Sequence, residues 1–393
     1  MSRTLPNLNT ETGAVPGHFV EPQLTQTMPR KMPSDTKSYN LDFLRASAVL
    51  FVFFGHLLQT LHIESMAGVI TIYDMAQTGV LIFFVHTSLV LMLSLDRQHC
   101  LGRSLFSSFY VRRIFRIYPL AIVIVAIMII GHVPPFPTQT YVPPSWTTTI
   151  SNVALIQNLT RAPSLYAPLW SLPYEVQMYI VLPFLFVFFQ KHWQGQWAAP
   201  ALWALTALAI AVLAVLRLKG ISLLYYFPCF LGGLVAYRLW FRGKRQLSFW
   251  GWPLVIAGCV LLRSAVGTFI GSRTVLPAGW IACLLLGWSV PLFREVQIRW
   301  LQTAASTVAK YSYGIYLSHA LVLWLSFVVL KKAPFALQIG VWLVGSGALP
   351  VLLYHCIEDP MIKAGVKVTR SMTRASMPAE KGCVSELTQP AEM

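Results

Sequence analysis

Charged side chains are scarce in this sequence. They make up only 11% of the 393 residues, whereas a typical soluble domain carries about 25%. Hydrophobic residues account for 56% of the chain, and the mean hydropathy is +0.60. This composition excludes a large water-soluble globule and is typical of a polytopic membrane protein.

Paired cysteines are also missing. The six cysteines occur singly, with no Cys-x-x-Cys pair and no cluster in a polar loop: Cys100, Cys229, Cys259, Cys283, Cys356 and Cys383. We therefore expect buried thiols, and neither a disulfide framework nor a zinc site. No spacing among the nine histidines resembles a metal site. The sequence thus predicts no bound metal and no resident cofactor.

Long apolar runs dominate what is present. A helix needs about 20 residues to cross a hydrocarbon core of about 30 Å, and runs of that length recur ten times. Their approximate spans are 41–62, 75–95, 116–133, 172–190, 198–216, 221–240, 249–268, 275–293, 311–330 and 336–357. The sequence therefore predicts an all-α, polytopic membrane helix bundle of about ten transmembrane helices.

The basic residues predict how these helices are oriented. If the N-terminus is cytoplasmic, most of the 30 Lys and Arg residues fall on the cytoplasmic side, as the positive-inside rule requires. An even number of spans then places both termini in the cytoplasm. Anchoring of loops to an anionic lipid leaflet explains the formal charge of +16. We therefore expect the lipid bilayer, and no nucleic acid, as a partner.

Three segments are expected along the chain. Residues 1–38 are polar and contain several prolines without helical or strand periodicity, which predicts a disordered cytoplasmic tail. Residues 39–360 form the transmembrane domain, and residues 361–393 form a short basic cytoplasmic tail. The one long connection, 134–171, is expected on the outer side, where it could lie over a substrate opening.

Ionisable residues inside the apolar runs are candidate functional residues, because each costs about 2.5–3.5 kcal/mol to insert. Arg45 and His56 lie in the first run, about 16 Å apart along a helix and nearly on one face. Glu175 begins the fourth run, at a depth similar to that of His56, where it could orient the imidazole for deprotonating a hydroxyl. The alternatives are a snorkelling Arg45, a His56 hydrogen-bonded within the bundle and a Glu175 that stabilises its helix N-terminus.

Other polar residues in or beside the apolar runs are also candidate functional residues. Arg113 and Arg116 are one helical turn apart at the cytoplasmic start of the third run, a spacing that suits phosphate binding as well as membrane anchoring. His319 stands among tyrosines in the ninth run, where helix packing is the alternative to a functional role. Glu358 and Asp359 end the tenth run, and we expect them to pair with a basic loop.

Six segments, in order along the chain, carry a resemblance to a known family. They are LDFLRASAVLFVFFGH (41–56), GVLIFFVHTSLVL (79–91), FYVRRIFRIYP (109–119), LWSLPYEVQMYIVLP (169–183), SYGIYLSH (312–319) and IEDP (357–360). Together they resemble the acyltransferase-3 family of integral membrane O-acyltransferases, which includes the bacterial O-acetylases of cell-envelope polysaccharides. The second segment departs from the usual pattern, because Val85, His86 and Thr87 follow Phe84 where the family commonly has Ser-Gly-Phe.

The resemblance implies a ten-helix enzyme of the inner (plasma) membrane. Such an enzyme takes an acyl group, usually acetyl, from cytoplasmic acyl-CoA and delivers it to a hydroxyl of a carbohydrate or related acceptor at the outer face. Mapped onto this sequence, the family motifs assign donor binding to Arg45, Arg113 and Arg116. Acyl-CoA is then a substrate, and the reaction needs no metal.

The resemblance also implies the catalytic residues. His56 would be the general base, with Glu175 as its orienting partner, and a covalent acyl-histidine is the alternative to direct transfer. His319, Ser88 and Trp170 are the candidate residues of the substrate pocket. The competing interpretation of the whole chain is a transporter or flippase of the same topology, in which the buried polar residues would form an ion pathway.

Overall fold

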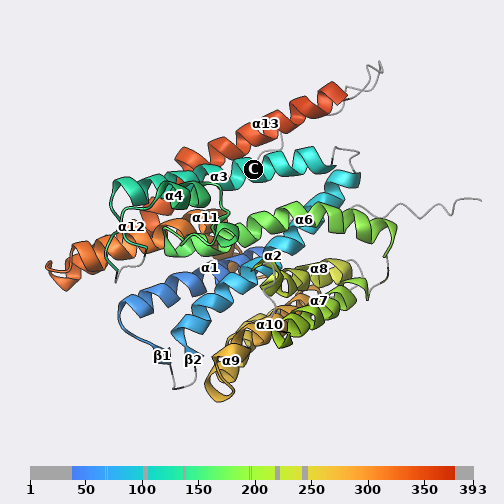
Figure 1. The fold of residues 1–393 in the computed structure, drawn as a ribbon, viewed down its shortest axis with the longest axis horizontal. Coiled ribbons are helices and arrows are strands. Elements are labelled where there is room, and N and C mark those ends of the chain that lie inside the picture. The colour runs from blue at the N-terminus through green and yellow to red at the C-terminus, as the bar shows by residue number, and fades with distance from the viewer. Residues whose placement is uncertain are drawn as a thin grey trace, which may run out of the picture. The chain divides into compact units, whose positions relative to one another are not determined.

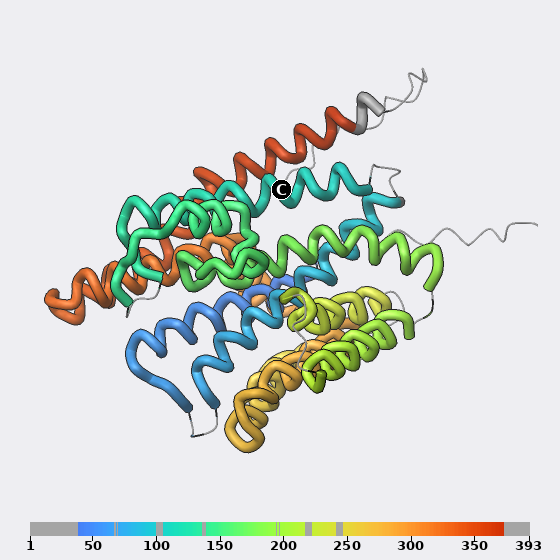
Figure 2. Tube along the Cα trace, viewed as in Figure 1, coloured from blue at the N-terminus to red at the C-terminus, as the bar shows by residue number. Residues whose placement is uncertain are grey.

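The computed structural model describes residues 38–376, apart from residues 67, 69, 101–104, 136–138, 194, 196, 217–221 and 241–246. Figure 2 traces the chain from blue at its N-terminal end to red at its C-terminal end. The expected N-terminal tail, 1–38, lies outside the described residues except for Ser38. Residues 377–393 of the expected C-terminal tail also lie outside them.

Helices make up most of the described chain (Figure 1). The α-helices are α1 (Tyr39–Thr60), α2 (Ile72–Cys100), α3 (Leu105–Ile130), α4 (Trp146–Val153), α5 (Gln157–Thr160), α6 (Leu172–Lys191), α7 (Ala198–Val215), α8 (Phe227–Trp240), α9 (Gly251–Phe269), α10 (Val275–Ser289), α11 (Arg299–Leu323), α12 (Phe335–Leu353) and α13 (Asp359–Ser376).

Short elements connect or extend these helices. The 3₁₀ segments are η1 (Ala167–Ser171), η2 (Ser222–Tyr225), η3 (Ser272–Thr274) and η4 (Val290–Leu292), and the π-helical segments are η5 (Trp324–Val329) and η6 (Tyr354–Glu358). The strands β1 (Ser65–Met66) and β2 (Ile70–Thr71) pair antiparallel between α1 and α2.

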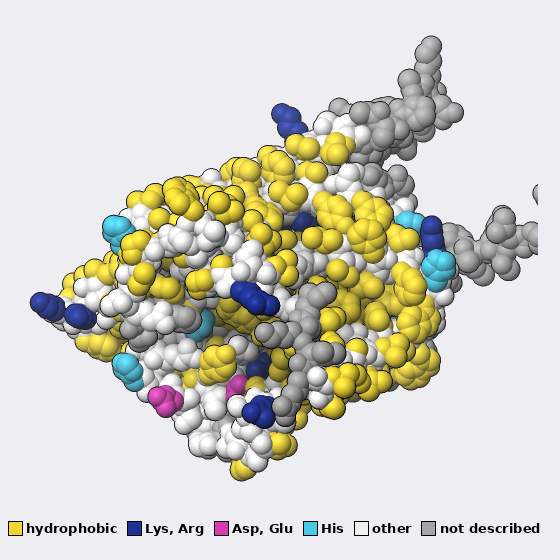
Figure 3. Space-filling model, in the orientation of Figure 1, with side chains coloured by type: hydrophobic (Ala, Val, Ile, Leu, Met, Phe, Trp, Pro, Cys, Tyr) yellow, Lys and Arg dark blue, Asp and Glu magenta, His cyan; other side chains and the backbone are white. Residues whose placement is uncertain are grey.

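The helices match the ten apolar runs of the sequence. Nine helical segments within the described ranges are long and apolar enough to cross a membrane. α8 corresponds to the remaining run; it has 14 residues, contains Pro228 in its first turn and packs against α2 and α10. Apolar side chains dominate the face shown in Figure 3, with few charged ones among them. The chain is therefore an all-α, multi-pass membrane helix bundle.

Three of the helices approach one another almost backbone to backbone. A Cβ added at Gly233 of α8 would collide with the Ser88 hydroxyl of α2, and one at Gly287 of α10 would collide with the Gly232 carbonyl oxygen of α8. Small residues permit such close packing in membrane proteins, where van der Waals contact replaces the hydrophobic effect between helices. The family resemblance implies a glycine in this part of α2 that the sequence lacks; in the structure Gly233 of α8 lies opposite Ser88.

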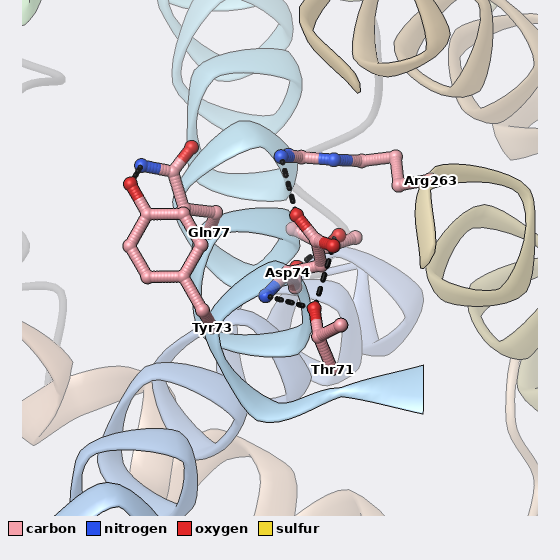
Figure 4. Close-up of polar contacts among 6 residues, drawn as sticks. Thr71, Tyr73, Asp74, Gln77 and Arg263 are labelled. Carbon is pink, nitrogen blue, oxygen red and sulfur yellow. Dashed lines mark hydrogen bonds and ion pairs between the residues drawn. The ribbon is translucent and has the colours of Figure 1, made fainter. Parts of the chain in front are cut away.

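A buried ion pair ties α9 to the start of α2 (Figure 4). Arg263 Nη2 lies 3.6 Å from Asp74 Oδ1, with both side chains almost fully buried. The Thr71 hydroxyl donates a 2.6 Å hydrogen bond to the other carboxylate oxygen of Asp74. A buried charge of either sign is costly without its partner, so this pair fixes the position of α9 against α2.

The chain continues as a helix beyond the last predicted apolar run. α12 passes through η6 into α13, which packs along α3 (Figure 1). The Arg112 side chain of α3 donates a hydrogen bond to Thr369 of α13, and Gly365 of α13 lies against Phe115. The first part of the expected C-terminal tail, 361–376, is therefore helical and packed against the bundle.

Candidate active site

A polar cavity lies between α1, α2, α6 and α11. It holds about 440 Å³ of space, part of it open to solvent. Each helix contributes a polar side chain to its lining: Arg45 from α1, Thr87 from α2, Glu175 from α6 and Ser312 from α11. The other lining residues are Val80, Phe83, Phe84, Ser171, Leu172, Tyr313 and Tyr316. Polar groups gathered inside apolar helices are costly and mark a functional site.

Arg45 is held in place by Ser312. Its Nε atom donates a 2.6 Å hydrogen bond to the Ser312 hydroxyl, and that hydroxyl donates in turn to the Ala309 carbonyl oxygen at 2.8 Å. The terminal nitrogens of Arg45 make no hydrogen bond within the described part of the chain. They therefore remain available to a ligand in the cavity.

Glu175 stands in the first turn of α6. Pro173 suits the same turn, because backbone N–H groups there have no partner within the helix and proline has none to leave unpaired. The helix dipole favours a carboxylate at this position. The Thr87 hydroxyl donates a 3.0 Å hydrogen bond to Glu175, and the Tyr179 hydroxyl also bonds to it. The structure does not bring Glu175 into hydrogen-bonding contact with His56.

The three arginines predicted to bind the donor lie in one cluster. Arg116 interacts electrostatically with both Arg45 and Arg113. Glu175 interacts with Arg45 and Arg113, while Glu358 interacts with Arg45 and Arg116. Three arginines and two carboxyl groups thus lie together in a part of the protein otherwise built from apolar helices. Such a cluster has the charge and the donors to bind phosphate groups.

Glu358 belongs to this cluster and not to a loop. It is 1% exposed, and neither carboxylate oxygen has a hydrogen-bond partner of good geometry among the described residues. A Cβ added at Gly314 would lie 3.2 Å from Glu358 Oε1, so α11 covers it closely. The expected pairing with a basic loop is therefore wrong for Glu358, which the π-helical segment η6 places inside the bundle. Asp359 does pair locally, with Lys363 at 2.6 Å.

His56 pairs with His319 of α11. The Nδ1 atom of His56 lies 2.7 Å from Nε2 of His319. The ring centroids are 5.0 Å apart and the ring planes differ by only 6°. Rings stacked face to face would have centroids about as close as their nitrogens. Here the centroids are much farther apart than the two nitrogens, so the rings meet edge to edge and the hydrogen bond lies near both ring planes. Sequence reasoning considered Glu175 as the partner of His56 and missed His319, 263 residues away.

The end of the long outer connection fixes the part of α11 that carries His319. The Ser171 and Tyr316 hydroxyls are 2.7 Å apart, and the Leu321 N–H donates a 2.7 Å hydrogen bond to the Tyr166 hydroxyl oxygen. Burial raises the pKa of the Tyr166 hydroxyl, so this group stays protonated. Residues on both sides of His319 are therefore anchored to the segment that leads into α6.

The remaining candidate pocket residues lie beside the cavity rather than in its lining. Ser88 is fully buried between α2 and α8, where its hydroxyl donates a 2.6 Å hydrogen bond to the Phe230 carbonyl oxygen. Trp170 packs against Tyr174 and Tyr226. Thr87, and not the neighbouring Ser88, lines the cavity. The sequence indicated this, because Thr87 is three and four residues from Phe84 and Phe83 and so lies on the same face of the helix.

Among the described residues, no group of three or more His, Cys, Asp or Glu side chains is arranged to hold a metal ion. The cavity is lined instead by Arg45, Glu175 and hydroxyl groups. The histidine pair lies outside this lining, where His319 packs against Tyr316. Together with the fold, these groups define a multi-pass membrane protein with a polar site between its helices.

Comparison with known families identifies the class of enzyme. Residues 38–355 match the acyltransferase-3 family, described as an acyltransferase domain. The match covers most of the chain and includes α1 to α12, so the protein belongs to this family and is a membrane acyltransferase. Searches of curated proteins and of solved structures gave no match.

Proposed function

We propose that this protein is an O-acyltransferase of the inner (plasma) membrane. It moves an acyl group, most simply acetyl, from cytoplasmic acyl-CoA to a hydroxyl of a cell-envelope carbohydrate or related acceptor at the outer face. The observation that carries the proposal is one polar cavity that borders the arginine cluster at Arg45 and reaches Tyr316, one helical turn from the histidine pair. The arrangement of the basic residues supports cytoplasmic termini.

The arginine cluster binds the donor in this proposal. Arg113 and Arg116 hold the phosphates of CoA, and the terminal nitrogens of Arg45 hold the part of the donor that enters the cavity. From Arg45 to His56 the first helix rises about 16 Å, a length comparable to that of the pantetheine arm. The arm therefore carries the thioester from the arginines towards His56. Glu175 and Glu358 keep the arginines ordered while the site is empty.

His56 supplies the base. It takes the proton of the acceptor hydroxyl as the hydroxyl oxygen bonds to the thioester carbonyl carbon, and it returns that proton to the CoA sulfur as the C–S bond breaks. A covalent acyl-histidine that is then passed to the acceptor uses the same residue. Holding donor and acceptor in one cavity supplies the proximity that either route needs.

The test is to separate donor binding from transfer. Purified protein in lipid is given acetyl-CoA and a crude envelope-glycan acceptor, and acetyl-CoA binding and CoA release are measured for wild type, His56→Ala and Arg113→Ala. We expect His56→Ala to bind acetyl-CoA and to release CoA at least about 100-fold more slowly. We expect Arg113→Ala to bind acetyl-CoA about tenfold more weakly, because it loses a charge-assisted contact to phosphate.

Arg299→Ala is the matched control for the arginine variant. Arg299 is exposed at the start of α11 and lies outside the cluster, so its loss leaves binding and turnover unchanged. If wild type neither binds acetyl-CoA nor releases CoA from any short acyl donor, the proposed donor is wrong. If Arg299→Ala and Arg113→Ala weaken binding equally, the arginine cluster is not the donor site.

A further inference from the structure

The hydrogen bonds of His319 determine which ring nitrogen of His56 can act as a base. His319 Nδ1 lies 3.2 Å from the Ile315 carbonyl oxygen. A carbonyl oxygen can only accept, so Nδ1 of His319 must carry the proton of this hydrogen bond. In a neutral imidazole the other nitrogen then has a lone pair and no proton. His319 Nε2 is therefore a hydrogen-bond acceptor.

The same reasoning extends to His56. Its Nδ1 lies 2.7 Å from His319 Nε2, and because Nε2 accepts, Nδ1 of His56 must donate. The proton of neutral His56 is thus on Nδ1, and Nε2 has the free lone pair. His56 Nε2 has no hydrogen-bond partner among the described residues, and the His56 side chain is partly exposed. It is the one nitrogen of the pair that remains open to a substrate proton.

We infer that His319 is a positioning residue that fixes the tautomer and ring orientation of His56, so that Nε2 of His56 faces the acceptor hydroxyl. A histidine thereby fills the place that a carboxylate often takes behind a catalytic histidine. The anchoring of Tyr316 to Ser171 and of Leu321 to Tyr166 keeps His319 in register with His56. The catalytic consequence of this inference rests on the proposed function, whereas the tautomer itself does not.

The pair also accounts for the proton during transfer. The acceptor proton goes to His56 Nε2 while His56 Nδ1–H keeps its hydrogen bond to His319 Nε2. The lone pair of His319 Nε2 stabilises the resulting imidazolium. When the C–S bond of the thioester breaks, the proton leaves Nε2 for the CoA sulfur. No proton has to pass through His319, because its Nδ1–H is bonded to a backbone carbonyl oxygen.

The first test needs no substrate. Protein with ¹⁵N-labelled histidine rings is studied by NMR in lipid, and His56→Gln and His319→Gln spectra assign the two rings by difference. The inference predicts that both rings carry their proton on Nδ1 and have an unprotonated Nε2, whereas an exposed histidine such as His192 gives the mixture of tautomers expected in water. A His56 ring with its proton on Nε2 would overturn the inference.

The second test uses two amide substitutions that differ in reach. In His319→Gln the side-chain oxygen falls near the position of Nε2 and can still accept from His56 Nδ1, but in His319→Asn it stops near the position of Nδ1. We expect kcat to fall less than about tenfold in His319→Gln and at least about 100-fold in His319→Asn, with KM for acetyl-CoA within about twofold of wild type in both.

Three outcomes are informative. Equal losses of kcat in the two variants, with both thermally stable, would show that His319 has only a packing role. A wild-type kcat in His319→Asn would show that His56 needs no partner. If wild type shows no acyl transfer at all, the proposed function fails, and the NMR tautomers still decide whether His319 fixes His56.

Discussion

Arg45 and Ser312 are joined by a 2.6 Å hydrogen bond across the interface of α1 and α11. The bond uses the Nε atom of Arg45, and the Ser312 hydroxyl is itself anchored to the Ala309 carbonyl oxygen. The guanidinium is therefore preorganised at the edge of the cavity before any ligand arrives. Preorganisation of this kind lowers the entropic cost of binding.

Replacing Ser312 by Ala should therefore weaken donor binding without abolishing transfer. The loss of a hydrogen bond to a charged group costs about 1.5–3 kcal/mol, part of which the substrate recovers by contacting Arg45 itself. We expect about a fivefold to tenfold higher Kd for acetyl-CoA, measured by calorimetry. Ser318→Ala is the control, because Ser318 is fully buried on the same helix and its hydroxyl has no hydrogen-bond partner among the described residues. Equal affinities in the two variants would contradict the assigned role of Ser312.

The ion pair between Asp74 and Arg263 should contribute strongly to stability. Arg263→Met leaves the Asp74 carboxylate buried without its partner, and breaking such a pair costs about 3 kcal/mol or more. We expect a clear drop in the thermal unfolding temperature in detergent. The double variant Asp74→Asn with Arg263→Met removes both charges and should recover most of the loss. A double variant less stable than Arg263→Met alone would contradict this account.

The close contact of α8 with α2 should not tolerate a single added methyl group. In Gly233→Ala the new Cβ meets the Ser88 hydroxyl and the Val85 backbone, so the helices must separate. We expect the substitution to destabilise the folded state by about 1–3 kcal/mol. The measured results should be a lower unfolding temperature and less folded protein recovered from the membrane. Gly258→Ala in α9 makes the same change where, apart from the backbone of its own helix, no described atom lies within 4 Å of the new Cβ. It should be neutral or slightly stabilising.

Glu358 should oppose donor binding in the empty site. Its carboxyl group interacts electrostatically with Arg45 and Arg116, so CoA phosphates must compete with it for the same arginines. Glu358→Gln removes that competition at nearly constant volume. We expect the variant to be less stable without ligand and to gain more thermal stability than wild type from saturating acetyl-CoA, as linkage requires. A smaller gain than in wild type would show that Glu358 supports donor binding instead.

The sequence predicted the class of fold because long apolar runs are a local signal. The ten runs correspond to helices, although their ends shifted: α3 begins at Leu105, well before the predicted start at 116, because the arginine-rich turn is itself helical and packs against α13. The last run was predicted to stop at 357, but η6 and α13 continue it as a helix.

The site was only partly accessible to sequence reasoning. The spacing of Arg113 and Arg116 suited phosphate binding, and the family resemblance added Arg45. The structure brings the three arginines together electrostatically. The partner of His56 was not predictable, because a contact across 263 residues depends on how α1 and α11 pack. Glu358 was misjudged because its place at a helix end suggested solvent, and nothing local revealed the π-helical turn that buries it.

The most direct test of the central claim is transfer across a sealed membrane. Protein is reconstituted into closed vesicles that contain envelope glycan, and acetyl-labelled acetyl-CoA is added only outside. The account predicts labelled acetyl ester on the enclosed glycan, with one CoA released outside for each ester formed, and neither product with His56→Ala. Enclosed glycan that stays unlabelled while wild type binds acetyl-CoA, or equal labelling by His56→Ala, would contradict it.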